Sequence, residues 1–148
     1  MINKGVENLA KAVINDAYVM SLGTADENGA WVADVIYVSD DNFGLYWISM
    51  PNARHSRAIE WNNKVACTIT ASSTTNKERA LQIEGTAERI NGPLFEYEKK
   101  LEAKRGLPLP KVAGEILNKG HVWYALKPKK LELIHSELFG YERQSVNV

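Results

Sequence analysis

Apolar residues recur at helical spacing near the start of the chain. Leu9, Val13 and Ile14 fall on one side of a helix, which predicts a short amphipathic helix over residues 3–16. Asn3 is the candidate cap at its first turn. Because only one side of this helix is apolar, we expect it to lie as a lid on the core that the rest of the chain forms.

From Tyr18 onward the pattern changes. Three runs rich in β-branched and aromatic residues cover residues 18–25, 30–39 and 43–49, and short turns of Asp, Asn and Gly separate them. Such runs and turns are typical of antiparallel strands. Since the connections are short, we expect the three strands to be neighbours in one sheet.

The second half of the chain contains four more segments that indicate strands. Residues 64–71 form an apolar run, and residues 79–90 form a longer one in which Gly85 is the position for a bulge or bend. Residues 122–128 and 130–136 predict a last hairpin.

Two further helices are predicted between these strands. Asn52 is a candidate cap for one or two turns in which Ala58, Ile59 and Trp61 would face the core. The clearest helical pattern covers residues 91–106. Six or seven strands with two or three helices on one flank predict an α+β barrel or a strongly curled antiparallel sheet.

The composition fits one globular domain over residues 1–148, with 45% hydrophobic and 24% charged residues. Its 18 Lys and Arg residues balance 18 Asp and Glu residues, so the overall charge favours neither nucleic acid nor an anionic membrane. The chain shows no signal peptide and no apolar run of membrane length, which predicts a cytoplasmic protein. Cys67 is the single cysteine and lies in an apolar run, so we expect a buried thiol and no zinc site.

The strongest candidate for chemistry is the start of the predicted helix after the third strand. Arg54, His55 and Arg57 fall in its first turn, where free N–H groups and the helix dipole favour an anion such as a phosphate. The alternative is an exposed helix start whose arginines pair with Glu60 and Asp34.

The remaining candidates are weaker. Tyr37, Tyr46 and Trp47 lie on predicted strands and would stack on a planar ring, although aromatic residues in strands more often pack in the core. His121 and His135 have no partner that the sequence reveals. The chain has no nucleophile elbow and no glycine-rich phosphate loop, which argues against a hydrolase and against the usual nucleotide-binding motifs.

Four segments, taken in order, carry a resemblance to a known family. They are residues 24–38, 45–69, 81–90 and 122–134. In their order and spacing the chain resembles the pyridoxamine 5'-phosphate oxidase-like, FMN-binding split-barrel family. The resemblance implies a split β-barrel, an FMN cofactor, a homodimer and a flavin-dependent oxidoreductase that acts on a small molecule.

The resemblance also implies which residues would bind the flavin. In that family the backbone of the second strand lies along the flavin ring, a position that Asp34, Val35 and Ile36 occupy here. The third strand and the start of the next helix hold the ribityl phosphate. The matching residues of this chain are Ile48, Ser49, Ala53, Arg54 and His55.

Several positions depart from the family pattern. Asp34 and Ser39 stand where pyridoxamine phosphate oxidase has an arginine and a lysine, and His55 replaces a lysine of the phosphate site. Ala80 replaces a glutamine that contacts the flavin, and the Arg-x-His element near the C-terminus has no counterpart. These departures predict a weaker phosphate clamp and argue against oxidation of pyridoxamine phosphate. The chain therefore looks more like the small, poorly characterised branch of the family.

Two other functions stay open beside the flavin enzyme. One is a module that binds or senses flavin, deazaflavin or haem without turnover, in which His55 or His121 would be an axial haem ligand. The other is a dimer with an empty or degenerate site, because the Asp34 carboxylate beside a phosphate would cost free energy. No side chain is a candidate general base, and the substrate class beyond a small molecule is open.

Overall fold

A computed structural model describes residues 4–148, so the predicted cap Asn3 lies outside the described residues. The helices are α1 (Lys4–Asp16), α2 (Arg54–Trp61), α3 (Phe95–Arg105) and α4 (Ser136–Phe139). The strands are β1 (Val19–Asp26), β2 (Gly29–Ile36), β3 (Val38–Ser39), β4 (Leu45–Ser49), β5 (Lys64–Ser72), β6 (Arg79–Ile90), β7 (Val122–His135) and β8 (Gln144–Val146).

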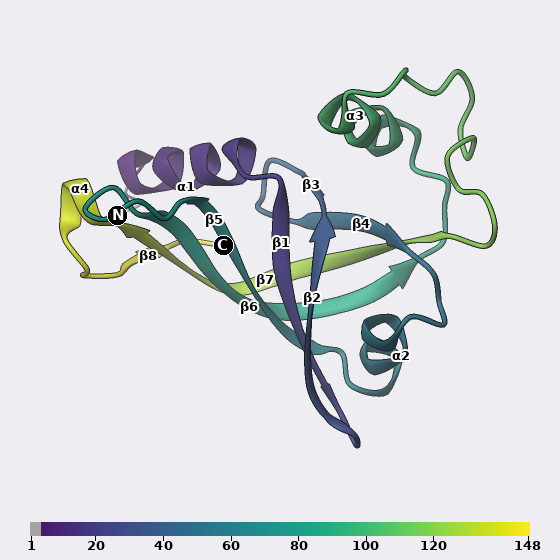
Figure 1. The fold of residues 1–148 in the computed structure, drawn as a ribbon, viewed down its shortest axis with the longest axis horizontal. Helices are drawn as coiled ribbons and strands as arrows, with labels where there is room; N and C mark the ends of the chain where they lie inside the picture. Colours follow the sequence, from purple (N-terminus) through teal and green to yellow (C-terminus); the bar gives the residue numbers. More distant parts are fainter. Residues whose placement is uncertain (1–3) are drawn as a thin grey trace.

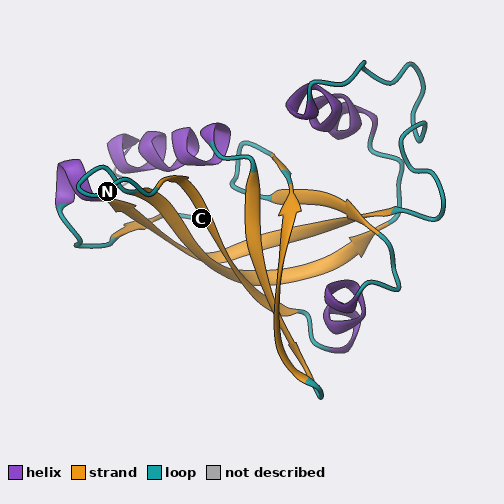
Figure 2. Cartoon of the chain, viewed as in Figure 1, coloured by secondary structure: helices purple, strands orange, loops and turns teal. Residues whose placement is uncertain are grey.

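The strands form one antiparallel sheet that curls into a half-barrel (Figure 1). Their order is β2-β1-β5-β6-β7-β4-β3, and β8 pairs with β7. Figure 2 shows the long strands crossing the middle of the molecule and the helices at its periphery. The predicted α+β split barrel is confirmed, with four helices in residues 4–148 where two or three were expected.

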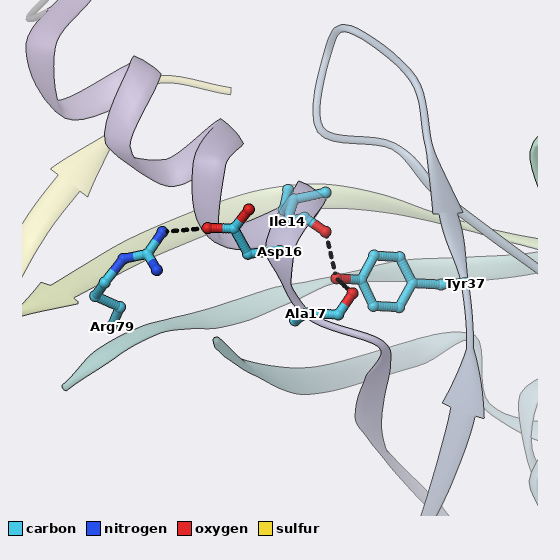
Figure 3. Close-up of polar contacts among 5 residues, drawn as sticks. All are labelled: Ile14, Asp16, Ala17, Tyr37 and Arg79. Atoms are coloured by element: carbon cyan, nitrogen blue, oxygen red, sulfur yellow. Dashed lines mark hydrogen bonds and ion pairs between the residues drawn. The ribbon is translucent and has the colours of Figure 1, made fainter. Parts of the chain in front are cut away.

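The predicted meander is confirmed for its first two strands, because β1 and β2 pair along their whole length. It is wrong in its second connection, because the predicted strand 30–39 is interrupted at Tyr37. Its last two residues form β3, which pairs with β4, while β2 and β4 lie near opposite edges of the sheet. Tyr37 is buried, and its hydroxyl donates to the carbonyl oxygen of Ile14 at 2.7 Å (Figure 3). Asp16 binds Arg79 beside it, also at 2.7 Å. These contacts hold the end of α1 against Tyr37, the residue between β2 and β3.

The predicted last hairpin is also wrong, because β7 is one continuous strand. The register between β6 and β7 shifts between Glu84 and Gly85, which places Pro128 opposite the irregularity. A proline is tolerated there because the ladder is already interrupted. The bend predicted at Gly85 is confirmed, since a Cβ atom at this position would collide with the carbonyl oxygen of Lys127.

The two faces of the sheet pack differently. The inner face carries the main core, which includes Met20, Leu22 and Trp47 and is closed by the apolar side of α1. The outer face has a smaller cluster around Trp123 and Leu101, covered by α3. The predicted burial of Cys67 is confirmed, on the inner face.

Part of the outer face is left open. Over β1, β2, β5 and β6 it holds a shallow hollow of about 440 Å³, whose walls include Ser21, Val32, Thr68 and Gln82. Within residues 4–148, no helix has both the length and the apolar character needed to cross a membrane.

Candidate functional site

The start of α2 has none of the usual devices that satisfy a helix terminus. β4 ends at Ser49, and a tight turn follows in which the Ala53 N–H donates to the carbonyl oxygen of Met50 at 3.1 Å. Ala53 is the N-cap, so the prediction of Asn52 as the cap is wrong. The cap makes no side-chain hydrogen bond, and the first turn holds no acidic residue. A helix start of this kind attracts an anion.

The body of α2 divides into a buried and an exposed side. Ala58 and Ile59 are buried as predicted, but Trp61 is 63% exposed, so its predicted place in the core is wrong. Helical periodicity places Trp61 with Arg54 and Arg57 on the outward side. The helix therefore presents two arginines to solvent while its inner side packs on the sheet.

His55 and Ser49 connect the end of β4 to the first turn of α2. The Oγ atom of Ser49 lies 2.8 Å from Nε2 of His55, at hydrogen-bond distance. Burial lowers the pKa of His55, which favours the neutral imidazole. In the tautomer in which Ser49 donates, the Nδ1–H group stays available as a hydrogen-bond donor.

Arg54 is held by an aromatic ring that the sequence did not indicate. Its guanidinium lies 4.2 Å from the ring centroid of Trp31, which is 44% exposed on β2. Among residues 5–148 no carboxylate lies within 4.0 Å of Arg54 or Arg57, so the alternative pairing with acidic residues is not found. Stacking occupies the face of the guanidinium and leaves its in-plane N–H groups available for a phosphate.

A cavity of about 380 Å³ lies beside this helix start. One wall combines three predicted residues, and the other comes from the segment around the end of α3. The lining includes Ile48, Ser49, Ala53, Arg105, Ile116 and His121. No partner of His121 could be predicted from the sequence, but its Nδ1 atom lies 2.6 Å from the carbonyl oxygen of Asn118. Arg105 and His121 are thus site residues that the sequence did not place near Ser49.

A buried glutamate holds the second wall. Glu98 is 0% exposed, and its carboxylate accepts hydrogen bonds from the N–H groups of Leu94 and Gly114, both at 2.7 Å. It also accepts one from Nε1 of Trp123 at 3.0 Å. Three donors satisfy a carboxylate that would otherwise be costly to bury. They fix the segment after α3 to both α3 and β7.

The three predicted residues of β2 point to different places. Ile36 packs against the same small cluster under α3 as Ile48, but it does not line the cavity. Val35 packs against the main core. Asp34 is exposed and accepts a hydrogen bond from the Ser21 hydroxyl at 2.7 Å. The structure therefore places Ile36 in one cluster with Ile48, a predicted phosphate-site residue, and directs the side chains of Asp34 and Val35 elsewhere.

The start of α2 combines several groups that can donate hydrogen bonds to an anion. It offers an uncapped helix terminus, a stacked arginine without a carboxylate partner and the Ser49–His55 pair. Arg105 and His121 line the neighbouring cavity together with Ser49 and Ala53, whereas Arg54 and His55 are not among its lining residues.

Comparison with known proteins places this arrangement in a family. The model of the family described as pyridoxamine 5'-phosphate oxidase matches residues 6–135. None of the curated proteins compared with the chain matches it.

Several solved structures share the fold. The conserved hypothetical protein Rv2991 from Mycobacterium tuberculosis has a TM-score of 0.78 and 15% identity, over 100% of this chain and 94% of its own. A putative pyridoxamine 5'-phosphate oxidase from Listeria innocua has a TM-score of 0.69 and 16% identity, over 86% and 97%. HutZ, the haem storage protein from Vibrio cholerae, has a TM-score of 0.61 and 19% identity, over 84% and 92%. At identities this low the structures establish a common fold alone. With the family match over residues 6–135, the chain belongs to the pyridoxamine 5'-phosphate oxidase family and has its split-barrel fold.

Proposed function

We propose that the protein binds FMN, with the phosphate at the start of α2, and acts as a flavin-dependent oxidoreductase on a small molecule. The observation that carries this proposal is the uncapped start of α2, with Arg54 stacked on Trp31 and no acidic residue in the first turn. A helix start with these properties lacks a negative group, and a phosphate supplies one.

The residues present fit the proposed cofactor. The N–H groups of the first turn, the Arg54 guanidinium and the Ser49–His55 pair would bind the phosphate. Arg105, which is paired with Glu102 at 3.1 Å, would add its remaining N–H donors from across the cavity. The backbone of β2 and the side chain of Ile36 would orient the ring. FMN supplies hydride exchange when bound, while the protein contributes binding, orientation and exclusion of water.

The Asp34 carboxylate is less of an obstacle than the sequence alone suggested. Its oxygen is bonded to Ser21 on the outer face, and Asp34 does not line the cavity beside α2. This geometry supports a working site over an empty or degenerate one.

The open part of the outer face supports a homodimer as the working form. Val32 is largely exposed there, and the hollow of about 440 Å³ has no covering element within residues 4–148. Two-fold pairing of one face with itself is the commonest way to cover such a surface. Sedimentation that finds only a 16.6 kDa species at micromolar concentration would rule the dimer out.

A flavin titration tests the proposal. Arg54→Ala should weaken FMN binding by about tenfold to a hundredfold, because a charge-assisted contact is worth roughly 1.5 to 3 kcal/mol. Lys129→Ala removes an exposed cation on β7 and should leave the affinity unchanged. Equal losses, or no loss in either variant, would show that the start of α2 is an ordinary solvated surface.

Haem is the second candidate, and His121 is the observation that favours it. With Nδ1 at 2.6 Å from the Asn118 carbonyl, the free nitrogen of this cavity-lining ring is Nε2, the arrangement that many metal-binding histidines show. A Soret band lost in His121→Ala would support haem. Absorbance typical of flavin that survives in this variant would support FMN.

A further inference from the structure

Two lysines of α3 line a second cavity, which is distinct from the cavity beside α2. Lys100 and Lys104 lie one helical turn apart and share a hollow of about 360 Å³. Ile14 and Asn15, at the end of α1, form part of its wall, and the link between β2 and β3 completes it. These walls are separate from those of the proposed FMN site, apart from their common use of α3.

The amine of Lys104 is fixed against Tyr37. Its Nζ atom lies 3.5 Å from the centroid of the Tyr37 ring and donates a hydrogen bond to the Tyr37 carbonyl oxygen at 2.7 Å. Tyr37 is itself immobilised, because it is buried and its hydroxyl is bonded to Ile14 (Figure 3). The amine therefore has a defined position at the cavity.

The charge on Lys104 has no counter-ion in the part of the chain that the structure describes. Among residues 5–148 no carboxylate lies within 4.0 Å of Lys104 or Lys100. The other charged or titratable groups around it are the phenols of Tyr37 and Tyr18 and the carboxylate of Asp16, which is taken up by Arg79.

Burial has a chemical consequence at this position. It lowers the pKa of Lys104 to about 8. About one tenth of such an amine is neutral at pH 7, against about one in three thousand for an ordinary lysine. A desolvated lysine beside another cation is the usual form of an amine that attacks carbonyl carbon.

We propose that Lys104 is a carbonyl-reactive amine, and that the cavity between α1 and α3 takes small apolar aldehydes, which Lys104 holds as a reversible imine. The apolar preference follows from the side chains of Ile14, Val38 and Ala103 in the lining. Lys100 is the more exposed of the two amines, so it is not the nucleophile.

The step needs no further reactant. The neutral Nζ atom attacks the aldehyde carbon, a C–N bond forms, and one N–H proton moves to the oxygen. The resulting hydroxyl leaves with the second N–H proton as water, and the C=N bond of the imine remains. Hydrolysis reverses the step and returns the aldehyde and the amine.

Reductive trapping of the full chain tests this site. Brief treatment with propanal and sodium cyanoborohydride at pH 7 converts each imine to a propyl amine, which peptide mass spectrometry measures at every lysine. Lys104 should react at least tenfold faster than Lys77, an exposed lysine in the loop between β5 and β6 that lies outside the proposed dimer surface. A rate at Lys104 equal to or below that of Lys77 would overturn the proposal.

Two further measurements separate the cavity from general reactivity. Ala103→Phe narrows the hollow without changing the amine, so trapping at Lys104 should fall about fivefold or more while trapping at Lys77 stays constant. Unchanged trapping at Lys104 would show that the cavity binds no aldehyde. Arg54→Ala should leave trapping at Lys104 unchanged. Reduced trapping at Lys104 in this variant would show that the reactivity depends on the flavin site, and it would contradict a separate aldehyde site.

Discussion

α2 and α3 are the two longer helices that follow strands in this chain. They differ in how the charged residues at their termini are placed relative to the helix dipole. α3 has Glu96 and Glu98 in its first turn, two basic residues in its last turn and Gly106 in the left-handed conformation at its end, with φ 71°. α2 has no acidic residue in its first turn, and it has Arg54 and His55 where the dipole is positive.

The difference separates a helix built for stability from one built for a ligand. Each charge on α3 complements the dipole, which contributes a few tenths to about 1 kcal/mol at each end. The Arg54 cation at the start of α2 opposes it. The folded protein regains this stability when an anion binds at the start of α2, since a ligand that binds only the folded state stabilises it.

The largest expected effect comes from breaking the start of α3. Glu98→Ala leaves three buried donors, on Leu94, Gly114 and Trp123, without an acceptor. The free energy of unfolding should fall by roughly 3 kcal/mol or more. Urea denaturation measures it, with Glu96→Ala as the control, because this exposed residue makes only a surface ion pair with Lys99. Equal losses in the two variants would mean that Glu98 is not the anchor described above.

Giving α2 the features of α3 should have opposite effects on stability and binding. Ala53→Asp adds a cap and a negative charge at the N-terminus, which should stabilise the free protein by about 1 kcal/mol. The same charge should repel the phosphate and weaken FMN binding. Ala53→Ser caps the helix without a charge and should lose less affinity at a similar gain in stability. Tighter FMN binding in Ala53→Asp would contradict an anion site at α2.

Removing the ring beneath Arg54 should have a moderate effect. Trp31→Ala leaves the guanidinium without its stacking partner, and an exposed cation–π contact is worth roughly 0.5 to 1 kcal/mol. FMN affinity, measured by fluorescence, should fall about two- to fivefold. Trp61→Ala removes another exposed tryptophan and serves as the control, because no cation is stacked on it in the described structure. A loss of the same size in Trp61→Ala would show that Trp31 has no particular role.

The smallest expected effect is the pH dependence at His55. Because burial lowers its pKa in the folded state, the unfolded chain binds the proton more readily. Stability should therefore fall as the pH drops below the ordinary histidine pKa of about 6.5, and it should be unaffected by this group at higher pH. Thermal unfolding between pH 5 and 8 measures this, with His55→Gln as the comparison. A profile that is the same in both proteins would exclude His55 as its cause.

Local features of the fold could be predicted from the sequence. The amphipathic pattern located α1, and Gly85 marked the bulge because only a residue without a Cβ fits against Lys127. The paths of the strands could not be predicted in the same way. The break at Tyr37 depends on hydrogen bonds to a helix distant in sequence, and the continuity of β7 depends on a bulge at Lys129 in its pairing with β6.

The residues of the candidate site show the same distinction between local features and contacts between distant segments. Ser49, Arg54 and His55 are close in sequence, so their clustering followed from the strand and the helix that carry them. Trp31 and His121 come from β2 and from the segment before β7, and only the curl of the sheet and the Glu98 anchor bring these segments to α2. No local pattern in the sequence reports such contacts.

A comparison of FMN with riboflavin tests the anion site at α2 most directly, because the two ligands differ only in the phosphate. FMN should bind at least about tenfold more tightly than riboflavin, and Arg54→Ala should remove most of that difference. Equal affinity of the two ligands for the unmodified protein would contradict a phosphate site at the start of α2.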